Sequence, residues 1–268
     1  MTVQPHSAAE VISSEGLPFR MVDLSHPISF HTPGWVGYPG MKQYYTQTLQ
    51  TNRIVSQRVE TSLHVGTHID APLHGTPGGG DIASIGLDRL VHQGVIVDIS
   101  DVVGPFDEIK PHHITDKVEV RRGDVLLYHT GFAKHYLGGS EEDLTRYMCR
   151  HPGAGRELAE WIVEMELAWT GSDTGSADHP MNTTIKDMRP DIRAEYEALI
   201  GSTVEERWPD EDLFVMHNVP FGKGIVHAEN VGGDLEALGT MRCVIGAFPW
   251  KFIGGEASIC RIIAFLTD

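Results

Sequence analysis

One short segment restricts what this chain can fold into more than any other. It is residues 62–75, SLHVGTHIDAPLHG, which hold four metal-binding side chains: His64, His68, Asp70 and His74. Their spacings of four, two and four are all even, so an extended backbone sends all four to one face. Gly66 and Pro72 disfavour both a regular helix and a long strand. The segment therefore predicts an extended, bent stretch that gathers three imidazoles and one carboxylate in a pocket.

Such a pocket suits a divalent metal ion. Two imidazoles and a carboxylate hold the ion and leave coordination positions open for water or substrate. The ion lowers the pKa of a bound water towards neutrality and so makes hydroxide available. The fourth group, His74, would lie just outside the ligands and shuttle a proton.

Composition narrows the class of protein. The chain has 268 residues, 41% of them apolar, which is enough for a folded core. We expect residues 1–20 to be a polar lead-in and residues 21–268 to form a single domain. A net charge of −16 argues against nucleic acids and anionic membranes as partners. Three scattered cysteines and the lack of a long apolar run or a signal peptide predict a cytoplasmic protein without disulfides or membrane spans.

Strand and helix patterns interleave along the chain, which predicts an α/β or α+β fold. The predicted strands are 53–60, 94–99, 124–130, 167–172, 213–217, 243–247 and 260–266. The predicted helices are 141–150 with Ser140 as its N-cap, 158–165 and 191–199. Two loops rich in Gly, Pro, Ser, Thr and His, residues 25–40 and 172–186, have the composition of functional loops.

A second group of metal-binding side chains lies downstream, in residues 216–233. It contains His217, His227 and Glu229. Composition alone leaves open whether these residues bind metal or pack in the core, because single histidines in strands are often structural.

The run from His64 to His74 matches in full the HxGTHxDxPxH signature of the metal-dependent cyclase family. That family includes bacterial kynurenine formamidases, isatin hydrolases and related lactam-cleaving enzymes. Further segments resemble it across residues 21–266: DLSHPI (23–28), GDVLL with TG (123–127, 130–131) and GSDT (171–174).

The resemblance implies roles for individual residues. The implied metal ligands in the signature are His64, His68 and Asp70, and His74 would be the catalytic histidine. His217 and Glu229 stand twelve residues apart and resemble the second metal site of binuclear formamidases. His227 has no role in the family and is interpreted as a bystander. Because mononuclear relatives exist, the resemblance leaves open one or two ions, and either Mn²⁺ or Zn²⁺.

The resemblance also implies a fold and an assembly. The expected fold is a single α/β domain with a curved or barrel-like central β core flanked by helices. Its relatives are usually dimers in which each active site includes residues of the neighbouring subunit. We therefore expect a homodimer or a higher homo-oligomer.

The first loop and the chain length bear on the substrate. By resemblance, an aromatic side chain of the loop contacts the substrate ring, and the candidates are Trp35, Phe30 and His31. Extra residues in a polar insert, 178–210, are typical of longer relatives and favour a small neutral cyclic amide, either an isatin-type or a γ-lactam ring. The alternatives are a kynurenine formamidase, a cyclase or dehydratase without net hydrolysis, and a non-catalytic metal-binding homologue. The intact His74 argues against the last of these.

Overall fold

The structure is a computed structural model that describes residues 16–267. Most of the predicted lead-in, residues 1–15, lies outside the described residues. Eight strands form the main sheet: β1 (Arg20–Asp23), β4 (His68–Asp70), β5 (Val91–Asp98), β7 (Val125–His129), β9 (Trp169–Ser172), β10 (Val226–Glu229), β11 (Met241–Pro249) and β12 (Ala257–Leu266). Seven of them close into a barrel in the order β12-β11-β5-β7-β9-β10-β4, because β4 pairs back onto β12. The predicted barrel-like core is confirmed, and β1 adds to the outside of β12.

Both faces of the barrel wall are covered on the side where strands run parallel. Strands β5, β7, β9 and β10 are parallel, whereas β4, β11 and β12 pair antiparallel. Along β5, Ile96 belongs to the core inside the barrel, while Val95 and Val97 pack with Leu158 and Ile162 of α6 (Arg156–Glu164). Burial on both faces explains why Val95, Ile96 and Val97 are consecutive apolar residues rather than an alternating pattern.

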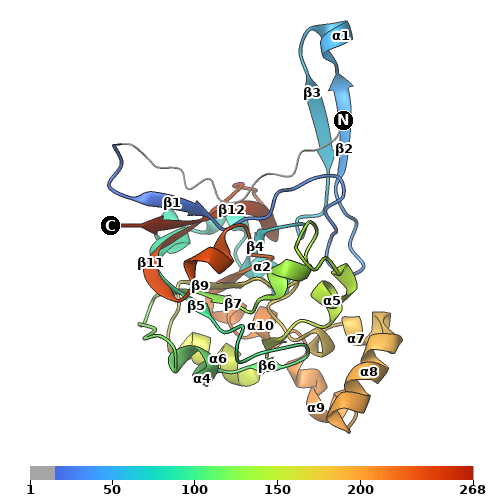
Figure 1. Cartoon of the computed structure of the whole chain (residues 1–268), viewed down its shortest axis with the longest axis vertical. Helices are drawn as coiled ribbons and strands as arrows, with labels where there is room; N and C mark the ends of the chain where they lie inside the picture. Colours follow the sequence, from blue (N-terminus) through green and yellow to red (C-terminus); the bar gives the residue numbers. More distant parts are fainter. Residues whose placement is uncertain (1–15, 268) are drawn as a thin grey trace.

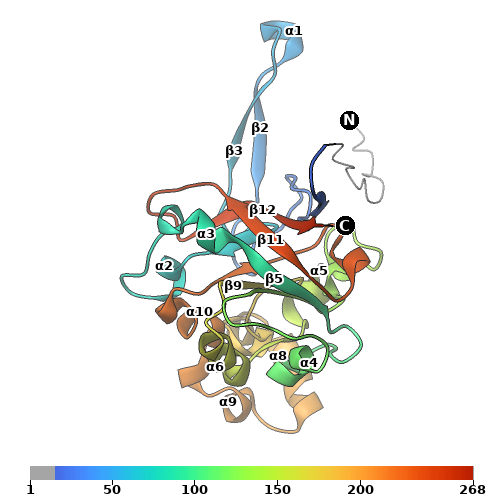
Figure 2. The same cartoon turned by 90° about the vertical axis from the view of Figure 1, so that its left-hand side faces the viewer.

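The remaining helices lie at the rim and on the helical side (Figures 1 and 2). They are α2 (Pro72–Gly75), α3 (Leu87–Leu90), α4 (Pro111–Thr115), α5 (Leu144–Cys149), α7 (Ile185–Met188), α8 (Pro190–Ile200), α9 (Val204–Arg207) and α10 (Val215–Asn218). Two short strands, β6 (Glu108–Ile109) and β8 (Gly153–Ala154), pair with each other. Within residues 16–267, none of the helices combines the length and the apolar character that crossing a bilayer requires.

The three predicted helices exist as α5, α6 and α8, but α5 begins later than predicted. Its N-cap is Asp143, whose carboxylate accepts a hydrogen bond from the Arg146 amide, and Ser140 lies outside the helix. The predicted strand over 213–217 is wrong, because Val215–His217 belong to α10 and Phe214 is its N-cap. Phe214 enters it with φ of 55°, and the Met216 amide donates to the Asp178 carboxylate at 2.9 Å instead of to a strand partner.

The insert predicted to be polar, residues 178–210, contributes a third apolar core. It folds into α7, α8 and α9, which lie together at the lower right of Figure 1. Met181 and Trp208 are buried there, and the Trp208 indole donates to the hydroxyl of Tyr196 at 3.0 Å. Most of its charged residues are at least partly exposed around this packed layer, whereas Asp178 and Lys186 are buried.

A hairpin arm projects from the barrel. It consists of β2 (Lys42–Gln47), α1 (Leu49–Asn52) and β3 (Ser56–Glu60), and it stands clear of the other elements in both Figures 1 and 2. Only the second half of the strand predicted over 53–60 is extended, since residues 49–52 and Arg53 form the turn of the arm.

Asp173 ties the ends of two barrel strands together. It follows β9 and is fully buried, and it accepts hydrogen bonds from the amide and hydroxyl of Thr130, both at 2.7 Å, and from the amides of Phe132 and Ala133. The Asp173→Asn variant replaces an anionic acceptor by an amide, and we expect unfolding free energy to fall by roughly 3 kcal/mol. Urea unfolding followed by circular dichroism measures this. The exposed Asp187 supplies the control, Asp187→Asn, and an equal effect of the two variants would contradict the assignment.

Candidate metal centre

Four polar side chains share one outer face of the barrel wall. His68 and Asp70 are two residues apart on β4, and His227 and Glu229 are two residues apart on β10. The antiparallel register pairs His227 with Asp70 and Glu229 with His68. The residues between them pack into the barrel core, so these four side chains point the opposite way. The even spacing in the sequence therefore produces the predicted clustering of His68 and Asp70.

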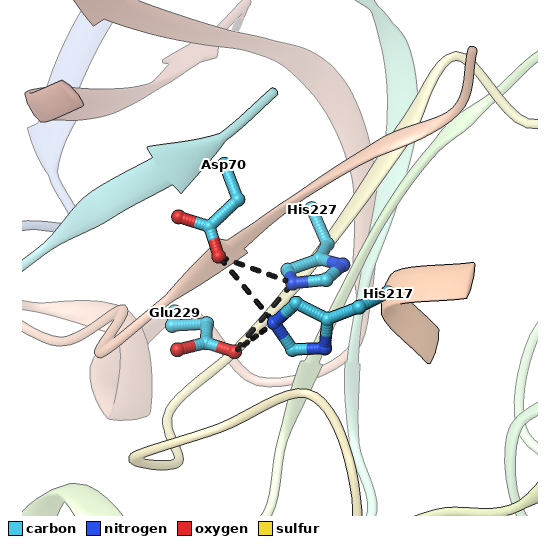
Figure 3. A group of neighbouring side chains, drawn as sticks. All are labelled: Asp70, His217, His227 and Glu229. Carbon is cyan, nitrogen blue, oxygen red and sulfur yellow. Dashed lines mark ion pairs between the residues drawn. The ribbon is translucent and has the colours of Figure 1, made fainter. Parts of the chain in front are cut away.

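Helix α10 adds a further imidazole to this face. The Nδ1 atom of His217 lies 2.6 Å from the Asp178 carboxylate, which directs Nε2 towards the two strands. Figure 3 shows the side chains of Asp70, His217, His227 and Glu229 converging from β4, α10 and β10. One ligand atom from each of the four lies within 4.8 Å of the others.

A second group surrounds the other oxygen of Asp70. His64 Nδ1 lies 3.2 Å from Asp70 Oδ1, and His64, Asp70 and His74 each offer an atom within 4.8 Å of the others. His68 Nε2 approaches the same Oδ1 at 3.4 Å and lies 3.6 Å from Glu229 Oε2. Asp70 thus lies between two sets of imidazoles and presents one oxygen to each.

The structure brings together the predicted metal ligands His64, His68, Asp70, His217 and Glu229. It also places His74 beside His64, with ring centroids 4.3 Å apart. The interpretation of His227 as a bystander does not fit, because its ring is buried within the group. The missed signal is its position two residues before Glu229, which on a strand means the same face.

The centre is built for a cation. Asp70 and Glu229 are buried carboxylates, a situation that is costly unless a positive charge compensates it. Burial tends to raise the pKa of both, yet His64 and His68 hold the pKa of Asp70 well below its usual range, and His227 lowers that of Glu229 to about 2. Both Asp70 oxygens and the Nε2 atoms of His68 and His227 are buried without a hydrogen-bond partner.

Unpaired buried donors and acceptors of this kind need a partner. Imidazole nitrogens and carboxylate oxygens are ligands for Zn²⁺ and Mn²⁺, so the residues present fit a divalent ion. The charges of the centre also favour a bound cation. Its two carboxylates, Asp70 and Glu229, have imidazoles as their neighbours in the centre and no lysine or arginine among these contacts.

Outer contacts aim several of these rings. His68 Nδ1 lies 2.8 Å from the Gly66 carbonyl, and His64 Nε2 lies 3.5 Å from a carboxylate oxygen of Glu256. Gly66 has a φ of 63°, and a Cβ there would lie 3.0 Å from Ile28, so the turn that carries His64 and His68 requires glycine. Carboxylates and carbonyls on the outer nitrogen orient metal-binding histidines. Glu256 was not identified from the sequence.

His74 occupies the edge of the centre. It lies on α2, is partly buried, and its ring centroid is 5.3 Å from that of His217. Burial lowers the pKa of His74 to about 4, so the imidazole is neutral near neutral pH and can accept a proton.

The centre opens into a cavity of about 560 Å³. His64, His74, His217 and Glu229 line one side of this cavity. The rest of the lining includes residues of the first loop and of the helical layer: Trp35, Val36, Tyr38, Met188, Leu213 and Phe214. Most of these side chains are apolar, which suits a compact ring with few polar groups.

Of the three predicted substrate-binding residues, one lines the cavity and two do not. Trp35 lines the cavity, together with Tyr38 from the same loop. Phe30 and His31 are exposed and do not line this cavity. Their ring centroids lie 3.9 Å apart, with the ring planes tilted by 40°. Leu213 and Phe214 were missed because they were predicted to begin a strand, although they lie at the entry to α10.

Comparisons with known proteins agree with this architecture. The chain is 26% identical over 247 residues to a kynurenine formamidase of Erythrobacter litoralis, covering 91% of this chain and 93% of that protein. It is 25% identical over 191 residues to a kynurenine formamidase of Bordetella petrii, covering 69% and 86% of the two chains.

Solved structures share the fold. Isatin hydrolase A from Labrenzia aggregata, bound to benzyl benzoate, superposes with a TM-score of 0.71 at 20% identity, over 94% of this chain and 95% of that one. Isatin hydrolase A from Ralstonia solanacearum gives a TM-score of 0.71 at 19% identity, over 92% of each chain. The model of the Cyclase family matches residues 22–179, which is more than half of the sequence. This chain therefore belongs to the Cyclase family.

Proposed function

We propose that this protein is a metal-dependent hydrolase that cleaves the C–N bond of a cyclic amide, of the isatin or γ-lactam type. The observation that carries the proposal is the buried group of imidazoles around two carboxylates, which opens into a largely apolar cavity. Its relatives include kynurenine formamidases by sequence and isatin hydrolases by fold, and both names describe hydrolytic enzymes.

The residues of the centre have distinct tasks in this reaction. The imidazoles and carboxylates around Asp70 would hold the divalent ion, which supplies Lewis acidity and lowers the pKa of a water molecule. Trp35 and Phe214 contact the ring of the substrate and orient its carbonyl towards Asp70. His74, neutral near pH 7, accepts a proton on the attacking side and returns it to the leaving nitrogen, so that the ring opens with the net addition of one water.

The charge of the cavity favours a neutral ring. Among the described residues that line it, none is lysine or arginine, so a substrate carboxylate would find no cationic partner there. Isatin and simple lactams carry no such group, whereas N-formylkynurenine carries one. The second candidate function, kynurenine formamidase, is favoured by the sequence relatives and stays an alternative for that reason.

The test is hydrolysis by protein loaded with Zn²⁺ or Mn²⁺, with isatin, a bicyclic γ-lactam and N-formylkynurenine as separate substrates. We expect turnover of a cyclic amide and a product heavier by one water. Turnover of N-formylkynurenine alone would replace the proposal by the alternative. A product of unchanged mass would indicate cyclase-type chemistry, and metal binding without any turnover would indicate a binding protein.

We also propose that two copies associate through the hairpin arm. A two-stranded hairpin alone is marginally stable in water, and this one exposes Tyr45, Leu49 and Ile54, each more than half exposed. At its base, a groove of about 1230 Å³ runs between the arm and the barrel, lined by Val59, Trp250 and other residues. An arm of a second copy would fill such a groove.

Light scattering coupled to size-exclusion chromatography measures this association. The wild type should have the mass of a dimer or a larger oligomer, and the double variant Tyr45→Lys, Leu49→Lys should have a lower mass. Leu87 on α3 is 73% exposed and far from the arm in sequence, so Leu87→Lys is the matched control and should leave the mass unchanged. A monomeric wild type would refute the proposal.

A further inference from the structure

The atoms around the second oxygen of Asp70 have the spacing of a metal coordination shell. Asp70 Oδ2 lies 3.6 Å from His217 Nε2 and 3.5 Å from His227 Nε2. Glu229 Oε1 lies 3.8 and 3.5 Å from the same two nitrogens. Hydrogen bonds would bring these atoms to roughly 2.7–3.2 Å. Ligands about 2.0–2.1 Å from a tetrahedral ion lie about 3.3–3.5 Å from one another.

His227 has no other evident task. It is 1% exposed, and neither of its ring nitrogens has a hydrogen-bond partner. Phe221 stacks on it with centroids 4.7 Å apart and an interplanar angle of 20°, which fixes the plane of the imidazole. The ring is absent from the lining of the cavity, so it is not placed to exchange protons with a substrate. A buried imidazole without a hydrogen bond is costly, and a metal ion would satisfy it.

We propose that His227 is the fourth protein ligand of this position, which becomes a closed site made of Asp70, His217, His227 and Glu229. The proposal rests on the metal dependence of the proposed function. It distinguishes a closed metal position from the reactive one within the centre. Four protein ligands leave a tetrahedral ion without an open position, as in structural zinc sites. Two imidazoles and two carboxylates in this arrangement suit Zn²⁺ better than Mn²⁺, which prefers octahedral oxygen ligands.

The other side of Asp70 then provides the reactive position. His64 and His68 are the imidazoles that approach Asp70 Oδ1, so a tetrahedral ion there would have three protein ligands and one position left for water or substrate. Both groups have members that line the cavity, so the two positions differ in the number of protein ligands. The two positions differ accordingly: the closed one retains its ion, and the open one exchanges it. Removal of His227 should weaken only the closed position.

Metal binding tests this without reference to activity. Apoprotein prepared with a chelator is titrated with Zn²⁺ by calorimetry, and bound metal is counted by mass spectrometry after dialysis. We expect two ions per wild-type chain. In His227→Ala, the dissociation constant of one ion should rise by about 100-fold or more, because loss of a ligand exceeds the 10–100-fold effect of losing an outer partner.

His179 supplies the matched control. It is also a fully buried histidine stacked on an aromatic ring, that of Trp208 at 4.7 Å, but it lies outside both metal-binding groups. His179→Ala should therefore retain two ions even if it is less stable. If His227→Ala does not fold, His227→Gln and the Co²⁺-substituted wild type provide the measurement, since a tetrahedral Co²⁺ ion absorbs visible light more strongly than a five- or six-coordinate one.

Two results would overturn the proposal: a wild type that binds one ion, or a folded His227 variant that binds two with unchanged affinity. Absence of turnover with two ions bound would instead count against the proposed function, and leave the assignment of His227 intact.

Discussion

The Asp70→Asn variant should lose both metal ions and, with them, turnover. Asp70 directs Oδ1 to His64 and His68 and Oδ2 to His217 and His227, and both of its oxygens lack a hydrogen-bond partner. An asparagine keeps one acceptor oxygen and replaces the other by an NH₂ group, which cannot bind a cation. One of the two positions therefore loses its shared oxygen, and both lose the negative charge between them.

We expect less than one ion per chain in Asp70→Asn and a fall in kcat/KM of about a thousandfold or more, beyond the 10–100-fold that loss of an outer partner causes. Metal counting and hydrolysis assays measure the two effects, and circular dichroism confirms that the variant is folded. Asp178→Asn is the graded control, because Asp178 reaches the centre only through the outer nitrogen of His217, while its other oxygen accepts from the Met216 amide. It should lower metal affinity by about 10–100-fold. Retention of two ions by Asp70→Asn would show that Asp70 does not bridge the positions.

The arrangement of the centre was partly predictable because strand geometry is local. His68 and Asp70 are two residues apart, and a strand places such pairs on one face whatever the rest of the fold. The same rule applied to His227 and Glu229 would have identified His227. Asp178 and Glu256 are different, because they reach the histidines only after β10 pairs with β4 and β12 closes the barrel. No spacing in the sequence encodes those contacts.

An apolar pattern gave a wrong secondary structure where a side chain, rather than a neighbouring strand, accepts the hydrogen bond of a backbone amide. Residues 213–217 have the apolar character of a strand, but the Asp178 carboxylate accepts from the Met216 amide and begins a helical turn. In the insert, charged and apolar residues are interspersed along α8 and α9, so its composition suggested a polar segment although Trp208 and Tyr196 are buried.

The His74→Ala variant should retain its metal and lose most of its activity. His74 lines the cavity beside His64, and burial keeps its imidazole neutral near pH 7, so it can accept a proton and pass it to the leaving nitrogen. Loss of a positioned acid–base group costs about 10²–10⁴-fold in rate, and this loss should appear in kcat with little change in KM.

Metal content distinguishes this role from ligation. His74 also offers a nitrogen within 4.8 Å of His64 and Asp70, so it is close enough to bind the ion itself. If it ligates, His74→Ala loses an ion and its activity returns only with excess metal. If it transfers a proton, both ions stay and added imidazole restores part of the rate, because a free imidazole can enter the space left by the side chain. The His74→Gln variant distinguishes ligation from proton transfer further, because glutamine keeps a polar group at the cavity edge but transfers no proton. If His74 transfers a proton, this variant should be as inactive as His74→Ala and should bind as much metal as the wild type.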